Sequence, residues 1–332
     1  MAKRKHHVSF ETASVAAEKK RFRSSYDKVR LGKQCDYEVL EKLGSGSFGD
    51  LFLGLSPTKE EVAIKVEKSD KGAKHNSAQL RHEYKVYREL VDCKGFCSIY
   101  FYGQFEEHNI MVMDLLSRSL EDAFQKCSQR FSLRTILQIA DQLLERIETL
   151  HSRHLIHRDI KPANFVLGRS EKSENRTIFA IDFGLSKRFR DPTTLTHMKV
   201  RHGSSLTGTP RYASINSHKG VEQSRRDDLE SIGYVLVYFF KGRLPWQGLA
   251  ADTPTDKYRK ILEKKTDTPL ETLCSDMPEP FSFLIKYARG LKFDEKPDYA
   301  ALRARFQELY RRHGFHTEAA GPLYWDWTES TD

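Results

Sequence analysis

Residues His157 to Asn164 read HRDIKPAN, the most informative segment of this sequence. It follows a long amphipathic pattern and precedes the short apolar run FVL. Asp159 can accept the proton of a hydroxyl group, and Lys161 can neutralise a phosphoryl group during transfer. Asn164 offers an amide oxygen that suits a hard cation such as magnesium. A chance loop rarely sets these residue types at these offsets, so the stretch predicts a loop built for phosphoryl transfer.

A second carboxylate is expected close to this loop. Asp182-Phe-Gly184 ends the apolar run IFAI, which predicts a short strand that delivers Asp182 to the same site. The tripeptide is common by itself, and its order and context after the first loop give it meaning.

Upstream, the glycine-rich stretch Gly44–Gly49 (GSGSFG) lies between two strand-like runs. A dinucleotide-binding glycine motif must open a helix, so this context favours a hairpin whose N–H groups close over phosphates. A plain glycine-rich hairpin is the alternative.

Val62-Ala-Ile-Lys65 places a lysine inside an apolar strand. Burial of its ammonium is costly unless it meets anions, and phosphate oxygens together with Glu83 would serve. A lysine that reaches from the strand to solvent is the alternative.

The order of the expected elements predicts an α+β fold of two lobes. Strand patterns dominate before residue 117, with one helix at 77–91. The later part is helical, and residues 133–150 carry apolar side chains at the spacing of one buried face, with Gln138, Asp141, Glu145 and Glu148 opposite. Residues 228–240 are apolar nearly all round, as in a central buried helix. We expect a strand-rich N-lobe, a helical C-lobe and a cleft between them.

Charge and cysteine content exclude several classes of protein. Residues 1–34 hold ten Lys and Arg against three acids, or +7, so the rest carries only about +2 of the total of +9. A nucleic-acid-binding domain should be basic in its body. The longest apolar run, 232–240, is too short to span a bilayer, and we see no secretory signal at the start. Five cysteines without paired metal spacing predict free thiols.

These motifs together resemble the eukaryotic protein kinases over residues 37–315. Lys161, two positions after Asp159, is similar to the serine/threonine class. After Gly208-Thr-Pro210 most such kinases continue Glu-Tyr-x-Ala-Pro-Glu, whereas this chain has Arg211 and then Ser214-Ile-Asn216. With EQSRRDDLES (222–231) and LPWQG (244–248), the chain is identified as a member of the casein kinase 1 family.

The resemblance implies a bilobal protein-kinase fold with ATP in the cleft, Mg²⁺ as cofactor and a monomeric enzyme. Residues 1–36 are polar and basic without clear periodicity, which predicts a mostly disordered leader. The resemblance implies a kinase domain (37–315, with lobes 37–116 and 117–315) followed by a short tail (316–332), in which Tyr324–Trp327 packs on the lobe. Asp159, Lys161 and Asn164 are the catalytic residues implied, and Asn164 and Asp182 the metal ligands. The ATP-binding residues implied are Leu43, Gly44, Ser45, Gly46, Ser47, Phe48, Gly49, Asp50, Leu51, Ala63, Lys65, Glu83, Met113, Asp114 and Leu116. Met113 resembles the gatekeeper beside the adenine, and Asp228 the buried aspartate that holds the catalytic loop.

The substrates implied are proteins that are acidic, or already phosphorylated, a few residues before the target hydroxyl. Arg211, Gln247, Gly248 and Lys257 would line the pocket for that anion, because a guanidinium presents a rigid fork of donors to phosphate. The alternative is that Arg211 pairs with a local acid. A second family pocket would use Arg158 and Lys187, but Ser204 replaces its usual lysine, which predicts weak anion binding.

The basic leader suggests where the protein acts. Lys3-Arg-Lys5 and Lys19-Lys-Arg21 resemble a bipartite nuclear-import signal, which predicts an import receptor as partner and both nucleus and cytoplasm as location. A solvated leader without a receptor, and weak contact with nucleic acid or an anionic membrane, are the alternatives.

Two other classes of function compete with an active protein kinase. An inactive kinase-fold scaffold predicts loss of Lys65, Asp159 or Asp182, and all three are present. A small-molecule kinase should lack the peptide-docking segment with Thr209 and Tyr212, which this chain has. Family members act in DNA repair, signalling and vesicle traffic, and the fold does not choose among them.

Overall fold

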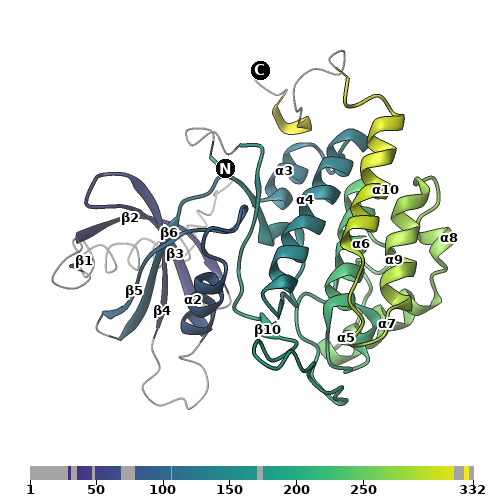
Figure 1. The fold of residues 1–332 in the computed structure, drawn as a ribbon, viewed down its shortest axis with the longest axis horizontal. Helices are drawn as coiled ribbons and strands as arrows, with labels where there is room; N and C mark the ends of the chain where they lie inside the picture. The colour runs from purple at the N-terminus through teal and green to yellow at the C-terminus, as the bar shows by residue number, and fades with distance from the viewer. Residues whose placement is uncertain are drawn as a thin grey trace, which may run out of the picture. The chain divides into compact units, whose positions relative to one another are not determined.

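The computed structural model describes residues 29–30, 36–46, 49–68, 79–105, 107–169, 175–317 and 325–328. The chain divides into two compact units, one formed by Met1–Lys85 with Ser98–Leu115 and the other by Val86–Cys97 with Leu116–Asp332. Each unit has its own secondary structure (Figure 1).

The first unit is built on an antiparallel sheet with the order β2-β3-β4-β6-β5. The strands are β2 (Asp36–Gly46), β3 (Gly49–Leu55), β4 (Glu61–Lys68), β5 (Ile99–Phe105) and β6 (His108–Asp114). A short β1 (Val29–Arg30) pairs with the start of β2. Helix α2 (Gln79–Glu89) follows β4 in the chain. The expected strand-rich first part is therefore present.

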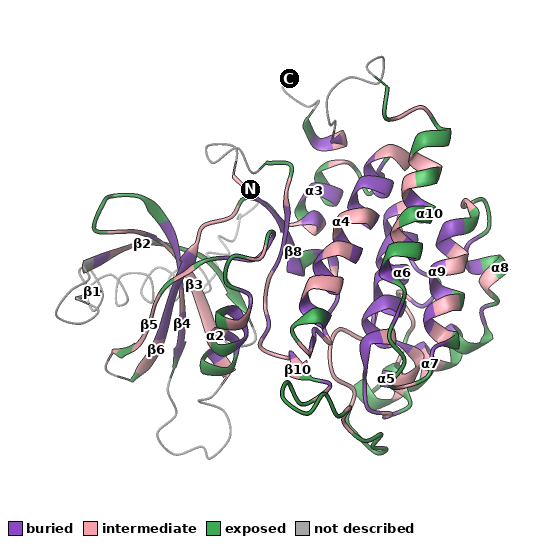
Figure 2. Ribbon diagram, in the orientation of Figure 1, coloured by how far each residue is buried: buried purple, intermediate pink, exposed green. Residues whose placement is uncertain are grey.

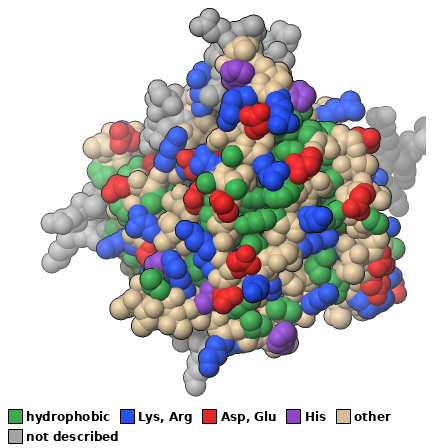
Figure 3. Space-filling model, turned by 45° about the vertical axis from the view of Figure 1, so that its right-hand side comes forward, with side chains coloured by type: hydrophobic (Ala, Val, Ile, Leu, Met, Phe, Trp, Pro, Cys, Tyr) green, Lys and Arg blue, Asp and Glu red, His purple; other side chains and the backbone are tan. Residues whose placement is uncertain are grey.

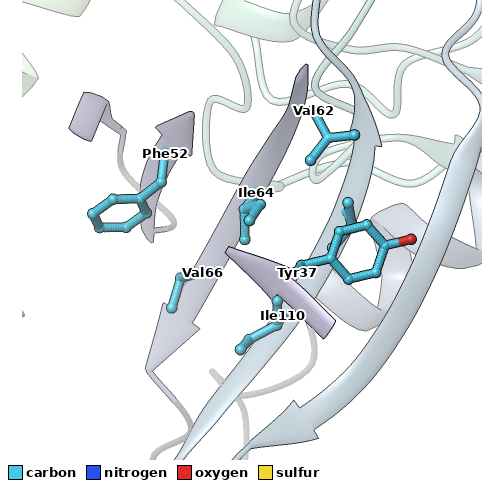
Figure 4. Close-up of a cluster of buried hydrophobic side chains, with 7 residues drawn as sticks. Tyr37, Phe52, Val62, Ile64, Val66 and Ile110 are labelled. Carbon is cyan, nitrogen blue, oxygen red and sulfur yellow. The ribbon is translucent and has the colours of Figure 1, made fainter. Parts of the chain in front are cut away.

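The core of this sheet comes from residues that alternate along neighbouring strands. Phe52 of β3, Ile64 of β4 and Ile110 of β6 are buried together, with Tyr37, Val62, Val66 and Val112 in the same cluster (Figure 4). Each such side chain contributes about 1.5–3 kcal/mol when it leaves water. Packing of one face therefore fixes the strand register, because a slip by one residue would turn the apolar face outward.

The second unit is mainly helical. Its long helices are α4 (Leu133–Ser152), α6 (Arg225–Lys241), α7 (Pro254–Asp267), α9 (Glu279–Gly290) and α10 (Tyr299–Arg312), and its shorter ones are α3 (Leu120–Lys126), α5 (Ile215–His218) and α8 (Leu270–Leu273). Two small strand pairs, β7 (Leu155–Ile156) with β10 (Lys187–Arg188) and β8 (Phe165–Leu167) with β9 (Ile178–Ala180), flank the loops of interest. Helices α4 and α6 carry more buried residues than the other helices of this unit (Figure 2).

Helix α4 differs from expectation on its polar face. Gln138 was expected opposite the buried stripe, but it is only 8% exposed and donates to the Tyr310 hydroxyl of α10. Asp141 on the same face accepts hydrogen bonds from Arg303 and Gln307. The polar face is therefore covered by α10 through hydrogen bonds, which the 3.6-residue period of one helix does not reveal.

The expected chain ends are only partly described. Within the predicted leader (1–36), Val29 and Arg30 form β1, and Asp36 begins β2; residues 1–28 and 31–35, with both basic clusters, lie outside the described residues. In the tail, Trp325 and Trp327 are buried and their rings stack 4.7 Å apart. Trp327 also lies 5.3 Å from the Phe131 ring, so this cluster packs on the helical unit as expected; Tyr324 lies outside the described residues.

Two expectations from composition agree with the part of the chain that the structure describes. Cys93, Cys97, Cys127 and Cys274 are free thiols, and Cys35 lies outside that part. None of its helices combines the length and the apolar character that a membrane crossing requires.

Candidate active site

The loop of residues 157–164 follows β7 and ends in the short 3-10 helix Pro162–Asn164, just before β8. Asp228, in the first turn of α6, holds its backbone. One carboxylate oxygen accepts from the N–H of His157 at 2.8 Å, and the other accepts from the N–H of Arg158 at 2.9 Å. His151 of α4 lies 2.9 Å from the same carboxylate. Arg158 has a positive φ of 69°, a strained conformation that these bonds maintain.

Asp159 is buried and lies between two donors of different kinds. Lys161 Nζ lies 2.6 Å from Oδ2, while the N–H and Oγ1 of Thr209 donate to Oδ1 at 2.8 and 2.7 Å. Burial raises the pKa of Asp159, but the Lys161 and Thr209 hydrogen bonds outweigh it and hold that pKa below its ordinary value. Asp159 is therefore a carboxylate at neutral pH, able to accept a proton as a hydroxyl reacts.

Asn164 and Asp182 come close to each other through the backbone. The N–H of Ile181 donates to the Asn164 carbonyl at 3.0 Å, which places Asp182 next to Asn164. Asn164 Nδ2 donates to the Asp159 carbonyl at 2.9 Å and lies 3.3 Å from Asp159 Oδ2, so its amide oxygen points elsewhere. Among the described residues no three His, Cys, Asp or Glu side chains form a metal-binding group. Two oxygen ligands of this kind fit a cation that takes its other ligands from phosphate and water.

The first unit contains the expected lysine–glutamate pair. Lys65 Nζ of β4 lies 2.6 Å from Glu83 Oε2 of α2, and the Glu83 side chain is 3% exposed. The carboxylate therefore holds the ammonium in one position.

The glycine-rich hairpin lies at the end of β2 and the start of β3. Gly46 pairs with Gly49, Ser45 with Asp50 and Gly44 with Leu51. Gly49 has a φ of 137°, and a Cβ there would lie 2.2 Å from the Val66 carbonyl oxygen, so only glycine fits. Leu43, on β2, is exposed. Ser47 and Phe48 lie outside the described residues.

Ala63, Met113 and Asp114, also expected at ATP, lie on two neighbouring strands. Ala63 of β4 is opposite Met113 of β6. The Asp114 carboxylate accepts from the Ser98 N–H at 2.7 Å and from the Tyr100 hydroxyl at 2.6 Å, which fixes the end of β6. Leu116 belongs to the second unit. Contact of all these residues with nucleotide remains a prediction.

Arg211 lies in a tight turn of the second unit, next to Thr209. Its guanidinium lies 5.7 Å from the Tyr212 ring and 5.8 Å from the Tyr238 ring, and it forms no salt bridge with any described carboxylate. The structure therefore does not support the alternative in which Arg211 pairs with a local acid. Gln247 Oε1 accepts from the Leu244 N–H, and Gly248 has a φ of 75° with open space at its Cα. Lys257 is an exposed residue of α7.

The second pocket is a cavity of about 200 Å³ lined by Arg158, Lys187 and Ser204. Arg201 lines it as well, a cation that the sequence motif did not indicate. Glu222 also lines the cavity and lies 3.0 Å from Lys187 Nζ, which offsets part of the positive charge. Weak anion binding at this pocket remains a prediction.

Two further residues of the site were not expected from the sequence. Lys265 of α7 is completely buried, and Trp246 donates from Nε1 to the Arg211 carbonyl at 2.7 Å. Lys265 follows the buried Ile261 by four positions and so lies on the same helix face. The four-residue spacing between Ile261 and Lys265 was the feature of the sequence that could have indicated a buried lysine.

Comparison with known families gives one match over most of the chain. Residues 37–289 match the family model of the protein kinase domain. The sheet of the first unit, the helical second unit and the paired Lys65–Glu83 and Asp159–Lys161 side chains agree with that match. The chain therefore belongs to the protein kinase family, whose activity uses ATP.

Proposed function

We propose that this protein is an active serine/threonine kinase of the casein kinase 1 type, which transfers the γ-phosphoryl group of ATP to acidic or phosphate-primed proteins. The observation that carries the substrate class is Arg211, a guanidinium that forms no salt bridge with a described carboxylate and follows Thr209 by two positions. Thr209 connects Arg211 to Asp159, because it binds the Asp159 carboxylate.

The proposed mechanism assigns one task to each charged residue. Asp159 orients the substrate hydroxyl and accepts its proton as the hydroxyl oxygen bonds to the γ-phosphorus. The bond from that phosphorus to the bridging oxygen breaks, and ADP leaves. Lys161 neutralises the charge of the transferring group, and Lys65, held by Glu83, binds the other phosphates. Asn164 and Asp182 would hold Mg²⁺, which when bound neutralises phosphate charge.

The inactive-scaffold alternative is tested by Asp159→Asn and Lys65→Met. We expect each variant to fold and to lose about 10²–10⁴ in turnover of a peptide, the usual contribution of a positioned acid or base. The measurement is the rate at which phosphate is transferred from ATP to the peptide. Lys59→Met, which changes an exposed lysine on a loop, is the matched control. Near-complete activity of Asp159→Asn would overturn the catalytic assignment.

The substrate class is tested with Arg211→Glu and one peptide made with and without a phosphate three residues before the target serine. A charge-assisted hydrogen bond of about 1.5–3 kcal/mol corresponds to roughly 10- to 150-fold in kcat/KM. We expect that loss on the phosphorylated peptide and a much smaller one on the unphosphorylated peptide, because Asp159 is unchanged.

A charge reversal elsewhere provides the control for this experiment. Arg312→Glu changes an exposed side chain whose ion pair with Glu308 is worth little. Equal losses on both peptides after Arg211→Glu would make the arginine structural and remove the support for a phosphate-reading kinase.

A further inference from the structure

Lys265 is the only lysine among the described residues that has no exposed surface. It lies on α7, where Ile261 is the other buried side chain. A lysine side chain is costly to remove from water, and an apolar residue of similar size is often as stable in such a place. A buried lysine here therefore calls for a reason beyond stability.

The contacts of Lys265 converge on the turn that carries Arg211. Its Nζ donates to the Ala213 carbonyl at 2.5 Å and to the Pro210 carbonyl at 2.9 Å. These two carbonyls lie on either side of Arg211 in the chain. Burial lowers the pKa of Lys265, but a neutral amine still has an N–H for each carbonyl.

Aromatic rings and a histidine complete the surroundings of this nitrogen. Nζ lies 4.8 Å from the Tyr234 ring centroid and 5.1 Å from that of Trp246, which suits a cation. His218 Nε2 lies 3.3 Å from it. Glu230, the acid whose charge acts on Lys265, is bound by Arg289 and Tyr234, and Lys265 forms no salt bridge with a described carboxylate. Nζ thus binds backbone carbonyls and ring faces in place of a counter-ion.

Trp246 joins the same arrangement to Arg211 itself. Its Nε1–H donates to the Arg211 carbonyl, so the carbonyls of Pro210, Arg211 and Ala213 each have a fixed donor. The N–H groups of Tyr212 and Ala213 donate to the Thr209 carbonyl at 3.0 Å, which closes the turn. Thr209 in turn binds Asp159.

We propose that Lys265 is a positioning residue for substrate specificity: by fixing the turn 209–213 it sets the direction of the Arg211 guanidinium toward a phosphate on the substrate. This inference rests on the proposed function, since it assigns Lys265 a task in reading the primed substrate. A side chain that only filled space would need no donor to two carbonyls. A loosened turn would leave the planar guanidinium in several directions and weaken its paired hydrogen bonds to two phosphate oxygens.

The test compares Lys265→Met, which keeps an apolar chain of similar length, with Lys264→Met, which changes the exposed neighbour on the same helix. The first measurement is the ratio of kcat/KM for the phosphorylated and unphosphorylated peptides. We expect Lys265→Met to lower that ratio about tenfold, the scale of one charge-assisted hydrogen bond, and Lys264→Met to leave it unchanged. Equal slowing on both peptides, or an unchanged ratio, would overturn the proposal.

The second measurement is amide hydrogen exchange over residues 206–216, which does not depend on substrate. Faster exchange in Lys265→Met supports the fixing of the turn, and exchange equal to that of the wild type overturns it. If Lys265→Met does not fold, Trp246→Phe keeps a ring beside Nζ but removes the donor to the Arg211 carbonyl, and the same lowered ratio is expected. A wild-type ratio near one would contradict the proposed function, while a high wild-type ratio that Lys265→Met retains would contradict this inference alone.

Discussion

At the scale of single residues, hydrogen-bond donors and burial together decide the charge of the buried groups in this protein. Asp159 stays ionised although it is buried, because Lys161 and Thr209 donate to it. For other buried groups burial has the largest effect on the pKa, and it favours the neutral form. His218, beside Lys265, is the group for which this has a measurable effect on stability.

His218 predicts a loss of stability on acidification. Burial, and then the charge of Lys265, lower the pKa of His218 to about 4, against an ordinary value of 6.5. Below pH 6.5 the histidine is therefore protonated in the unfolded chain, whereas in the native state it is protonated only below about pH 4. The stabilising contribution is complete above pH 6.5 and is lost as the pH falls through that window.

We expect this group to account for about 2–3 kcal/mol of unfolding free energy between pH 6.5 and 4. Urea titrations of the wild type and of His218→Gln across that range measure it. Asp227, with a pKa raised by burial to about 6, shifts stability in the opposite sense, so the difference between the two proteins is the relevant quantity. Parallel pH curves for wild type and variant would contradict the prediction.

At the scale of elements, α4 depends on a contact from the far end of the chain. Ser132 is its N-cap residue, and its side chain accepts from the Thr135 N–H. Asp326 accepts from the Ser132 hydroxyl at 2.7 Å and from its N–H at 2.5 Å. A carboxylate at the start of a helix interacts favourably with the N–H groups and the dipole there, so the segment Asp326–Thr328 is tied to the first turn of α4.

We expect Asp326→Ala to lower the free energy of unfolding by about 1–2 kcal/mol, the size of a lost cap and its hydrogen bonds. Thermal unfolding measures it, and Asp252→Ala, an exposed aspartate without a hydrogen-bond partner among the described residues, is the control. Equal melting temperatures for the two variants would mean that the Trp325 and Trp327 rings alone hold the segment.

At the scale of the whole molecule, the positive charge is distributed unevenly along the chain. On the face shown in Figure 3, Lys and Arg side chains alternate with Asp and Glu and do not form one continuous basic surface. The excess charge lies in residues 1–34, with +7 of the +9. We propose that this leader, and not the kinase domain, directs the protein to the nucleus.

Removal of residues 1–28 tests this while it keeps β1 and its pairing with β2. We expect the truncated protein to spread through the cell with unchanged peptide turnover, since its catalytic residues are retained. Alanine substitution of Lys3–Lys5 and Lys19–Arg21 in the full chain is the matched control and should act like the truncation. Nuclear enrichment that survives both changes would show that the signal lies elsewhere.

The sequence by itself determined the protein kinase fold and its ATP use, because catalytic loops carry their residues at short fixed spacings. HRDIKPAN, the Val62–Lys65 strand and the glycine hairpin are local patterns, and the apolar period of α4 is local too. Contacts between residues far apart in the chain became known from the three-dimensional structure. The α10 cover over Gln138, the Asp326 contact with Ser132 and the Lys265 contacts with Pro210 and Ala213 each join residues more than 50 positions apart. Such contacts depend on how helices pack, and a single-helix period records which face is buried but not which element buries it.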